Sequence, residues 1–270
     1  MRRLLCSICV SLIAVLALAS YGQERNGAIK IEASTVEVYA TIFDQRNRYI
    51  DDLTRDRFEI REDGKPQQIV SFETSVESLS CAILLDTTGS MNESLPRVKN
   101  AIVKLIDALG PQDAVAIYTF NERLVVNQAF TTDKSAAKRA VLRTRAQGRT
   151  ALFDAIAQTT ADISKRAGKK ALLVFSDGDD NASMLNGRSA VLRAQKIGVP
   201  LYAIAEGDAT KSPKLEALLQ ELSKQTGGSA YRAKKADDIE EVFDKLSEDL
   251  RHVYMLSYQP TSLASDGKWR

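Results

Sequence analysis

The sequence predicts an α/β fold: a doubly wound, mainly parallel sheet with helices on both faces, accompanied by a small β module. Two wholly apolar runs, Ala82–Leu85 and Ala171–Phe175, are each bounded by polar residues, which is typical of strands buried on both faces of a parallel sheet. Segments of strand and helix character alternate over residues 80–250, which indicates parallel strands connected by helices. Residues 28–75 have only strand character, which predicts the separate β module.

The first 19 residues predict a cleaved signal peptide. Arg2 and Arg3 form a charged start, Leu4–Leu18 is almost wholly apolar, and Ala17–Ala19 fits the small-residue cleavage pattern. The alternative is an uncleaved membrane anchor, but the apolar run is shorter than the roughly 20 residues that a spanning helix needs. We therefore expect an exported protein, periplasmic or extracellular, with no stable membrane span after cleavage.

The net charge bears on the kind of partner that the protein binds, and the cysteine count bears on whether it contains a disulfide. Without Arg2 and Arg3, the 37 Lys and Arg residues fall to 35 and balance the 35 Asp and Glu residues. Nothing therefore favours nucleic acid or an anionic membrane as the main partner. Cys6 and Cys9 lie within the signal peptide, so Cys81 is the one cysteine of the mature chain. We expect no internal disulfide, with Cys81 as a small buried residue.

The N-terminal β region contains one alternating strand and one hairpin. Apolar and polar residues alternate over Val36–Ile42, the period of a half-buried strand. Phe58–Glu62 and Gln67–Phe72 are predicted to pair around the turn signal Asp63-Gly64, with Lys65-Pro66 making the loop slightly longer.

The N-terminal strands need a partner, because about 45 residues of strands are too few to be stable alone. We expect residues 28–75 to pair with Val253–Tyr258 from the far end of the chain. The segment 251–270 is predicted to be a strand to Gln259, a loop, and the start of another strand at 267–270. Because the sequence stops there, we expect the chain to be truncated at Arg270.

The helices of residues 80–250 are predicted from apolar residues at helical spacing and from capping residues. In the first of them Ser94 is the expected cap, Pro96 lies at the start and Gly110 ends the helix. The other predicted helices span 132–143, 151–165, 189–196, 214–224 and 236–250, and the other strands span 114–120, 124–130, 200–205 and 230–233.

The first buried strand is followed by a set of hard oxygen atoms. Asp86, Thr88 and Ser90 are spaced i, i+2, i+4 directly after it. In open α/β sheets, ligands bind beyond the carboxyl ends of the strands, and oxygen donors with few charges suit Mg²⁺. The alternative is that the hydroxyl groups only cap the next helix.

Two further loops support a metal site. Thr150 lies in a loop before a helix, although it or Asp154 would also suit the helix N-terminus itself. The second buried strand ends on Asp177, so Asp86 and Asp177 are expected at the same sheet edge. Two close carboxylates raise each other's pKa values and cost stability, and a cation removes that cost.

These residues resemble the metal-ion-dependent adhesion site of the von Willebrand factor A (VWA) domain. The family pattern is Asp-x-Ser-x-Ser, then a Thr, then an Asp, and Thr88 replaces the first Ser here. The resemblance covers about residues 80–250. The first 75 residues, through Leu53–Phe58, Glu62–Pro66 and Ser71-Phe72, resemble an exported bacterial group of VWA-related proteins. The matching site residues are Asp86, Thr88, Ser90, Thr150 and Asp177.

The resemblance implies a role for each site residue. The hydroxyl groups of Thr88 and Ser90 would bind the metal directly, the carboxylates often through water, and Thr150 in some states. A Glu or Asp carboxylate of a protein partner would complete the shell. The expected metal is Mg²⁺, with Mn²⁺ or Ca²⁺ as alternatives. Asp179 and Asp180 would either crowd this rim or, as we expect, lie in a solvated loop.

The expected function is an exported, metal-dependent protein-binding module for adhesion or assembly, not an enzyme. The extra Thr in Asp86-Thr-Thr-Gly-Ser90 departs from the aspartic protease motif, and Thr88 stands where a haloacid dehalogenase phosphatase needs a second Asp. The sole histidine, His252, is expected to be a surface or packing residue. The alternatives are a structural envelope protein with a vestigial site and, ranked lower, a metal-dependent hydrolase.

Overall fold

The computed structural model describes residues 35–46, 48–74, 78–177, 180–206, 212–233 and 238–260. The predictions for the signal peptide at 1–19, the loop after Pro260 and the strand start at 267–270 concern residues outside these ranges.

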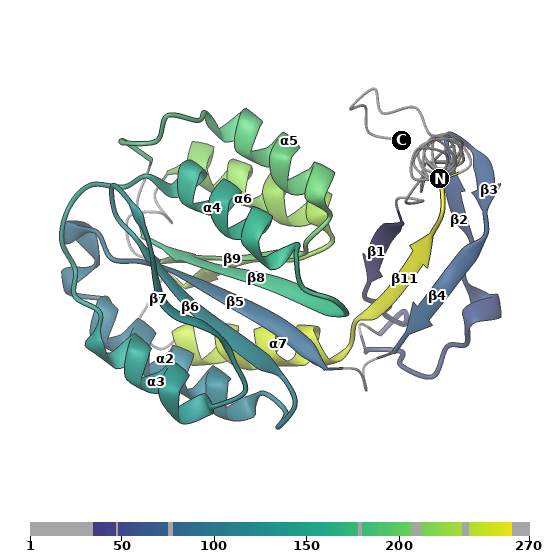
Figure 1. Ribbon diagram of the computed structural model, residues 1–270, viewed down its shortest axis with the longest axis horizontal. Helices are drawn as coiled ribbons and strands as arrows, with labels where there is room; N and C mark the ends of the chain where they lie inside the picture. The colour runs from purple at the N-terminus through teal and green to yellow at the C-terminus, as the bar shows by residue number, and fades with distance from the viewer. Residues whose placement is uncertain are drawn as a thin grey trace, which may run out of the picture. The chain divides into compact units, whose positions relative to one another are not determined.

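A six-stranded sheet forms the centre of the fold, with strand order β10-β9-β8-β5-β6-β7 (Figure 1). All neighbouring strands are parallel except β6 and β7, so the predicted mainly parallel α/β sheet is confirmed. The strands are β5 (Leu79–Asp86), β6 (Ala114–Phe120), β7 (Leu124–Thr131), β8 (Lys169–Ser176), β9 (Leu201–Glu206) and β10 (Ala230–Ala233).

Helices cover both faces of this sheet (Figure 1). One buried cluster joins the sheet to α2, α3 and α7, and a second joins the opposite face to α4, α5 and α6. The helices are α2 (Leu95–Ala108), α3 (Lys134–Arg143), α4 (Leu152–Ile163), α5 (Gly187–Ile197), α6 (Pro213–Thr226) and α7 (Asp238–Arg251). Helix α7 thus includes Arg251, which the sequence had placed in the last strand; the helical spacing of apolar residues continues to Leu250 and carries Arg251 with it.

The two middle strands are buried along their whole length. Every residue of β5 is buried because helices pack on both faces and strands lie on both sides. Cys81 is fully buried in β5, as predicted, and burial raises the pKa of its thiol to about 12. The thiol therefore stays protonated and packs as an apolar group.

A second, three-stranded sheet has the order β1-β11-β4. Its strands are β1 (Val36–Ala40), β4 (Ile69–Glu73) and β11 (Tyr254–Tyr258). Both pairings are antiparallel, and the C-terminal strand β11 lies between the two N-terminal strands. The predicted pairing of the N-terminal strands with Val253–Tyr258 is therefore confirmed.

The predicted hairpin is shorter and tighter than expected. Its strands are β2 (Ile60–Glu62) and β3 (Lys65–Gln67), which pair around the two residues Asp63 and Gly64. Both turn residues have positive φ, +48° and +76°, as a two-residue hairpin turn with the right twist requires. Lys65-Pro66 belongs to the strand and does not lengthen the loop. Most of the expected second arm is β4, which pairs with β11 instead.

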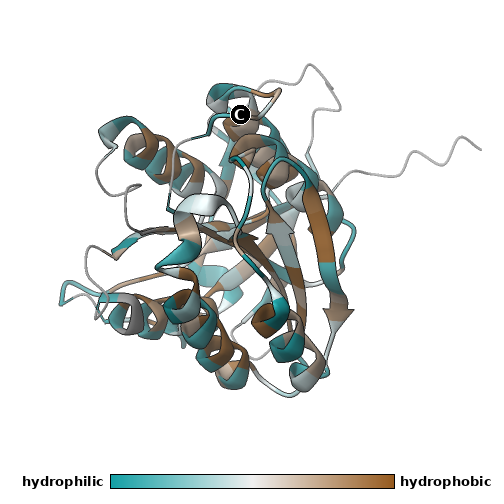
Figure 2. Ribbon diagram, turned by 90° about the vertical axis from the view of Figure 1, so that its left-hand side faces the viewer, coloured by the Kyte–Doolittle hydropathy of each residue, from teal (hydrophilic) through white to brown (hydrophobic). Residues whose placement is uncertain are grey.

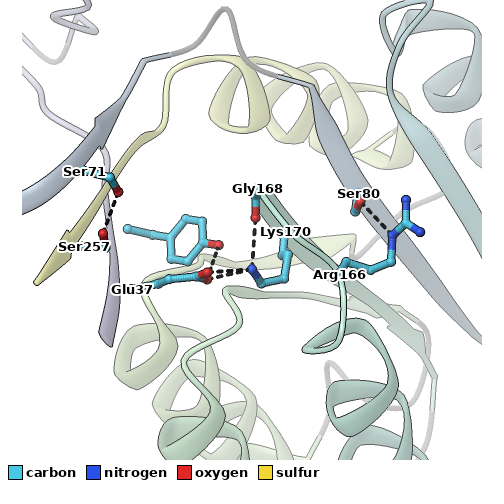
Figure 3. A network of polar contacts seen from close by, with 8 residues as sticks. Glu37, Ser71, Ser80, Arg166, Gly168, Lys170 and Ser257 are labelled. Carbon is cyan, nitrogen blue, oxygen red and sulfur yellow. Dashed lines mark hydrogen bonds and ion pairs between the residues drawn. The ribbon is translucent and has the colours of Figure 1, made fainter. Parts of the chain in front are cut away.

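A buried ion pair connects β1 to the first residues of β8 (Figure 3). Lys170 Nζ lies 2.7 Å from Glu37 Oε2 and donates to Gly168 O at 3.0 Å. The Tyr39 hydroxyl donates to the same carboxylate at 3.0 Å. The sequence placed the start of this strand at Ala171, where the apolar run begins. The structure corrects this start to Lys169, since both lysines find partners inside.

His252 packs as predicted. Its ring stacks on Tyr49 with centroids 4.2 Å apart, and its Nδ1 lies 2.6 Å from Asp51 Oδ2. The Tyr49 hydroxyl in turn donates to Asp249 at the end of α7, so this cluster holds the segment after β1 against α7. Across the described part of the chain, every helix is too short or too polar to cross a bilayer.

Candidate metal centre

The five predicted site residues lie where strands of the central sheet end. Asp86 is the last residue of β5, and Asp177 directly follows β8, the neighbouring strand. Thr88 is the N-cap of the 3-10 helix η2 (Gly89–Asn92) and Ser90 lies within it. Thr150 lies two residues before α4, next to the N-cap Ala151. Figure 2 looks onto this side of the sheet, where the hydrophobic strands end between the helices.

Asp86 is fully buried and its carboxylate is held by two hydrogen bonds. The backbone N–H of Thr88 donates to Oδ1 at 2.9 Å, and the Ser176 hydroxyl donates to Oδ2 at 2.7 Å. Burial raises the pKa of Asp86 to about 6, the negative charge of Asp177 adds to the increase, and these hydrogen bonds oppose it. The buried surroundings of Asp86 therefore disfavour its charged form unless a cation is present.

A continuous chain of oxygen atoms connects the two strand ends. The hydroxyl oxygens of Thr88 and Ser90 lie 3.0 Å apart, and Ser90 Oγ donates to Asp177 Oδ1 at 2.8 Å. The structure thus brings Thr88, Ser90 and Asp177 together, with Asp86 joined to Thr88 through the backbone.

Thr150 is buried beside this chain and held by its backbone. Its N–H donates to the Asn181 side chain, and its carbonyl accepts from the N–H groups of Asn181 and Ala182. Its loop is also fixed to the first site loop, since Gly89 N–H donates to Gly148 O at 3.2 Å. Gly148 has φ +86°, a conformation that glycine adopts without strain. Thr150 is therefore placed near the cluster, although its described hydrogen bonds run through the backbone.

Asp180 and Asp154, both beside the site, accept hydrogen bonds that the sequence did not predict. Asp180 was expected in a solvated loop, but it accepts hydrogen bonds from Phe153 N at 2.9 Å and Ser183 N at 3.0 Å. It therefore satisfies the N-terminus of α4, which corrects that prediction. Asp154 accepts from Met184 N and Leu185 N, so it anchors the same loop. The spacing Asp180-x-x-Ser183 is a local turn signal that would have indicated this.

The donor set fits a small, hard cation. In the part of the chain that the structure describes, no three His, Cys, Asp or Glu side chains gather into a metal-binding group. A cation at this edge would therefore rely on hydroxyl groups and two carboxylates. Adjacent ligand oxygens on octahedral Mg²⁺ lie about 3.0 Å apart, given metal–oxygen distances of about 2.1 Å. The 3.0 Å between Thr88 Oγ1 and Ser90 Oγ fits such an edge.

Comparison with protein families decides the assignment of the domain. The model of the von Willebrand factor type A domain matches residues 81–245, more than half of the chain. The chain belongs to this family. The matched region begins within β5 and ends within α7, so it contains the sheet, its helices and all five site residues of the VWA pattern. A comparison with curated proteins found no match.

Solved structures share the VWA fold at low sequence identity. A von Willebrand factor type A protein from Catenulispora acidiphila has a TM-score of 0.54 and 20% identity over 65% of this chain, which spans 43% of that protein. The conserved hypothetical protein BatB from Bacteroides thetaiotaomicron has a TM-score of 0.53 and 20% identity, over 64% of this chain and 98% of that one. The pilus adhesin SpaC from Lactobacillus rhamnosus GG has a TM-score of 0.54 and 15% identity, over 66% and 31%.

Proposed function

We propose that this protein is an exported, non-enzymatic VWA module that binds a divalent cation and captures a protein partner through a carboxylate. The observation that carries the proposal is the oxygen chain from Thr88 through Ser90 to Asp177, beside the fully buried Asp86. Thr88, Ser90, Asp86, Asp177 and Thr150 would hold Mg²⁺. Bound there with few charged ligands, the cation would supply an electrophilic position for one more carboxylate.

The residues around the site support docking better than catalysis. The hydroxyl groups point to the shared cluster and to carboxylates, and His252 is engaged with Asp51 and Tyr49 beside the second sheet. An enzyme that activates a bound water needs an additional base or acid at the site. In our proposal the five site residues all serve as metal ligands, and His252 is engaged elsewhere. A docking role uses every one of them without a further group.

Export and the partner class are part of the same proposal. The charged start, apolar run and small-residue cleavage pattern of residues 1–19 support transport across a membrane. A protein partner is supported by the family, and the fold of this chain is shared by a pilus adhesin. Because a module that docks carboxylates needs an acidic partner, the captured surface should present Glu or Asp.

Calorimetry with Mg²⁺ on the chelator-treated mature protein tests the metal centre. We expect one binding site, and Asp86→Ala should remove it. The matched control Asp244→Ala, on the exposed side of α7, should leave binding intact. Retained binding in Asp86→Ala would refute the assignment. An absence of binding in the wild-type protein would favour a structural envelope protein with a vestigial site.

Capture of a partner is tested separately, by pull-down from envelope extract with Mg²⁺ or with chelator. Thr150→Ala should weaken capture with little change in the free energy of unfolding, because the backbone of Thr150, not its side chain, fixes the loop. Capture that is equally strong in chelator and in Thr150→Ala means that the partner uses another surface.

A further inference from the structure

Strand β7 forms an edge of the central sheet without protecting charged or proline residues, although its pairing with β6 shifts register between Val115 and Tyr118. It is the last strand in the sheet order, so within the described residues no strand pairs with its outer side. Its eight residues include no charged residue, proline or glycine, and Val125 and Val126 are 50% and 54% exposed. In natural proteins, lysine, proline or a covering element normally prevents another chain from pairing with an edge strand. A long, uncharged edge of this kind is a template for an added strand.

A basic cavity lies directly beside this edge. It has a volume of about 250 Å³ and lies between β7 and α3. Arg139 and Arg143 are four positions apart on α3, so they lie on the same face of the helix. The full lining is Asn127, Gln128, Ala136, Arg139, Ala140 and Arg143.

The two guanidinium groups are available to an external anion. Arg139 lies 3.8 Å from Asp133, and both side chains are more than half exposed, so this ion pair is weak. Within the described residues Arg143 is exposed and makes no hydrogen bond or ion pair. The side-chain carbonyl of Asn127 accepts from Thr119, which leaves its amide N–H groups as further donors. The cavity therefore presents donors and positive charge next to an open strand edge.

We propose that β7 binds an extended acidic peptide segment of a protein partner. The peptide adds as a strand to the outer edge of β7 through backbone hydrogen bonds, and its Glu or Asp carboxylates pair with Arg139 and Arg143. Backbone pairing supplies affinity in such strand addition, and the side-chain pockets supply specificity. Arginine is suited to this task because its planar donors engage carboxylates in pairs.

Charge favours this occupant over a second copy of the same chain. Helix α3, beside β7, carries Lys134, Lys138, Arg139 and Arg143 and no acidic residue. Pairing of two β7 edges about a two-fold axis would bring two such helices near each other, and their like charges oppose the association. An acidic strand gains from the same charges.

Fluorescence anisotropy with a labelled peptide of about eight alternating Val and Glu residues tests the proposal, with the Val and Lys peptide as its counterpart. In low salt with chelator, the acidic peptide should bind the mature protein, and the basic peptide should not. The double variant Arg139→Glu/Arg143→Glu should weaken binding by at least about tenfold. The matched control Arg193→Glu, an exposed position on α5, should leave it unchanged. Val126→Glu, which places a negative charge on the exposed edge, should also weaken binding of the acidic peptide.

Amide exchange measured by NMR locates the peptide. The backbone amides of β7 should gain protection on peptide binding, and Asp86→Ala should bind the peptide as well as wild type, which separates this surface from the metal centre. Equal affinity for both peptides, undiminished binding in the double variant, or protection outside β7 would overturn the proposal. A dimer in sedimentation that Val126→Lys dissociates would overturn it in favour of a second copy.

Discussion

Strand β8 has positive charges at its start and a negative charge just beyond its end, and the partners of these charges differ in kind. At its start, Lys169 and Lys170 are buried, and the charge of Lys170 is matched by Glu37 from the second sheet. Beyond its other end, Asp177 lies beside the buried Asp86, and the hydrogen bonds described for this pair come from neutral hydroxyl and N–H groups.

This difference contrasts a charge that is paired within the chain with two carboxylates that, in our proposal, bind a cation. The ion pair at the start of β8 is complete within the chain and joins two sheets. Burial disfavours the charged form of Asp86 beyond the other end of β8, and under our proposal a bound cation would offset that cost. Removing a charge should therefore have opposite effects on stability at the two ends.

The largest effect is expected at the start of β8. Glu37→Gln leaves the ammonium group of Lys170 buried without a counter-charge, because the Lys170 side chain is 4% exposed. We expect a loss of about 3 kcal/mol in the free energy of unfolding, measured by urea denaturation. Lys170→Met should cost less, since the remaining Glu37 is 31% exposed and water can solvate it. The reverse order of the two variants would contradict this account.

Asp86→Asn should increase the free energy of unfolding in chelator, the opposite of the change expected for Glu37→Gln. The pKa of Asp86 is raised from 3.8 to about 6, so between these pH values the folded protein holds a proton that the unfolded chain has released. Stability should therefore fall as pH rises through this interval and remain lower above pH 6. Asp86→Asn should remove the fall, with a gain of up to about 3 kcal/mol at pH 7, measured by denaturation across pH. An unchanged pH profile would show that Asp86 is not the titrating group.

The smallest effect is expected at the rim of the candidate metal centre. Asp154→Ala removes the acceptor for Met184 N and Leu185 N, and Met184 is 97% exposed at the tip of that loop. We expect a loss of about 1 kcal/mol in stability, faster exchange of these two amides, and unchanged Mg²⁺ affinity. The control Asp162→Ala, at the other end of α4, should leave both amides protected. Unchanged exchange in Asp154→Ala would mean that other contacts fix the loop.

Most of the central fold was predictable because its signals are local. The strands over 114–120 and 230–233 have the predicted bounds, since apolar runs and nearby turn residues define them. Asp86 and Asp177 were placed at one edge because each follows a strand buried on both faces. Their neighbouring position then follows from the parallel pairing of β5 with β8.

What the sequence did not predict depends on contacts between distant residues. Lys170 was left out of the predicted strand, because its partner Glu37 lies 133 positions away and no local pattern connects them. Asp180 was assigned to a solvated loop for the same reason, since the helix end that it caps belongs to a different segment. Burial of a charged side chain can be inferred only once its partner is known.

The position of β11 between β1 and β4 also sets an order of folding during synthesis. The hydroxyl of Tyr254 in β11 accepts a hydrogen bond from Leu53 N, across 201 positions of sequence. β1 and β4 emerge before the central domain, whereas β11, which lies between them in the sheet, emerges after it. The central domain, with mostly nearer contacts, can fold in the meantime, and the second sheet closes last. Until then β1 and β4 are unpaired strands that can aggregate, so we expect their protection during folding to depend on chaperones.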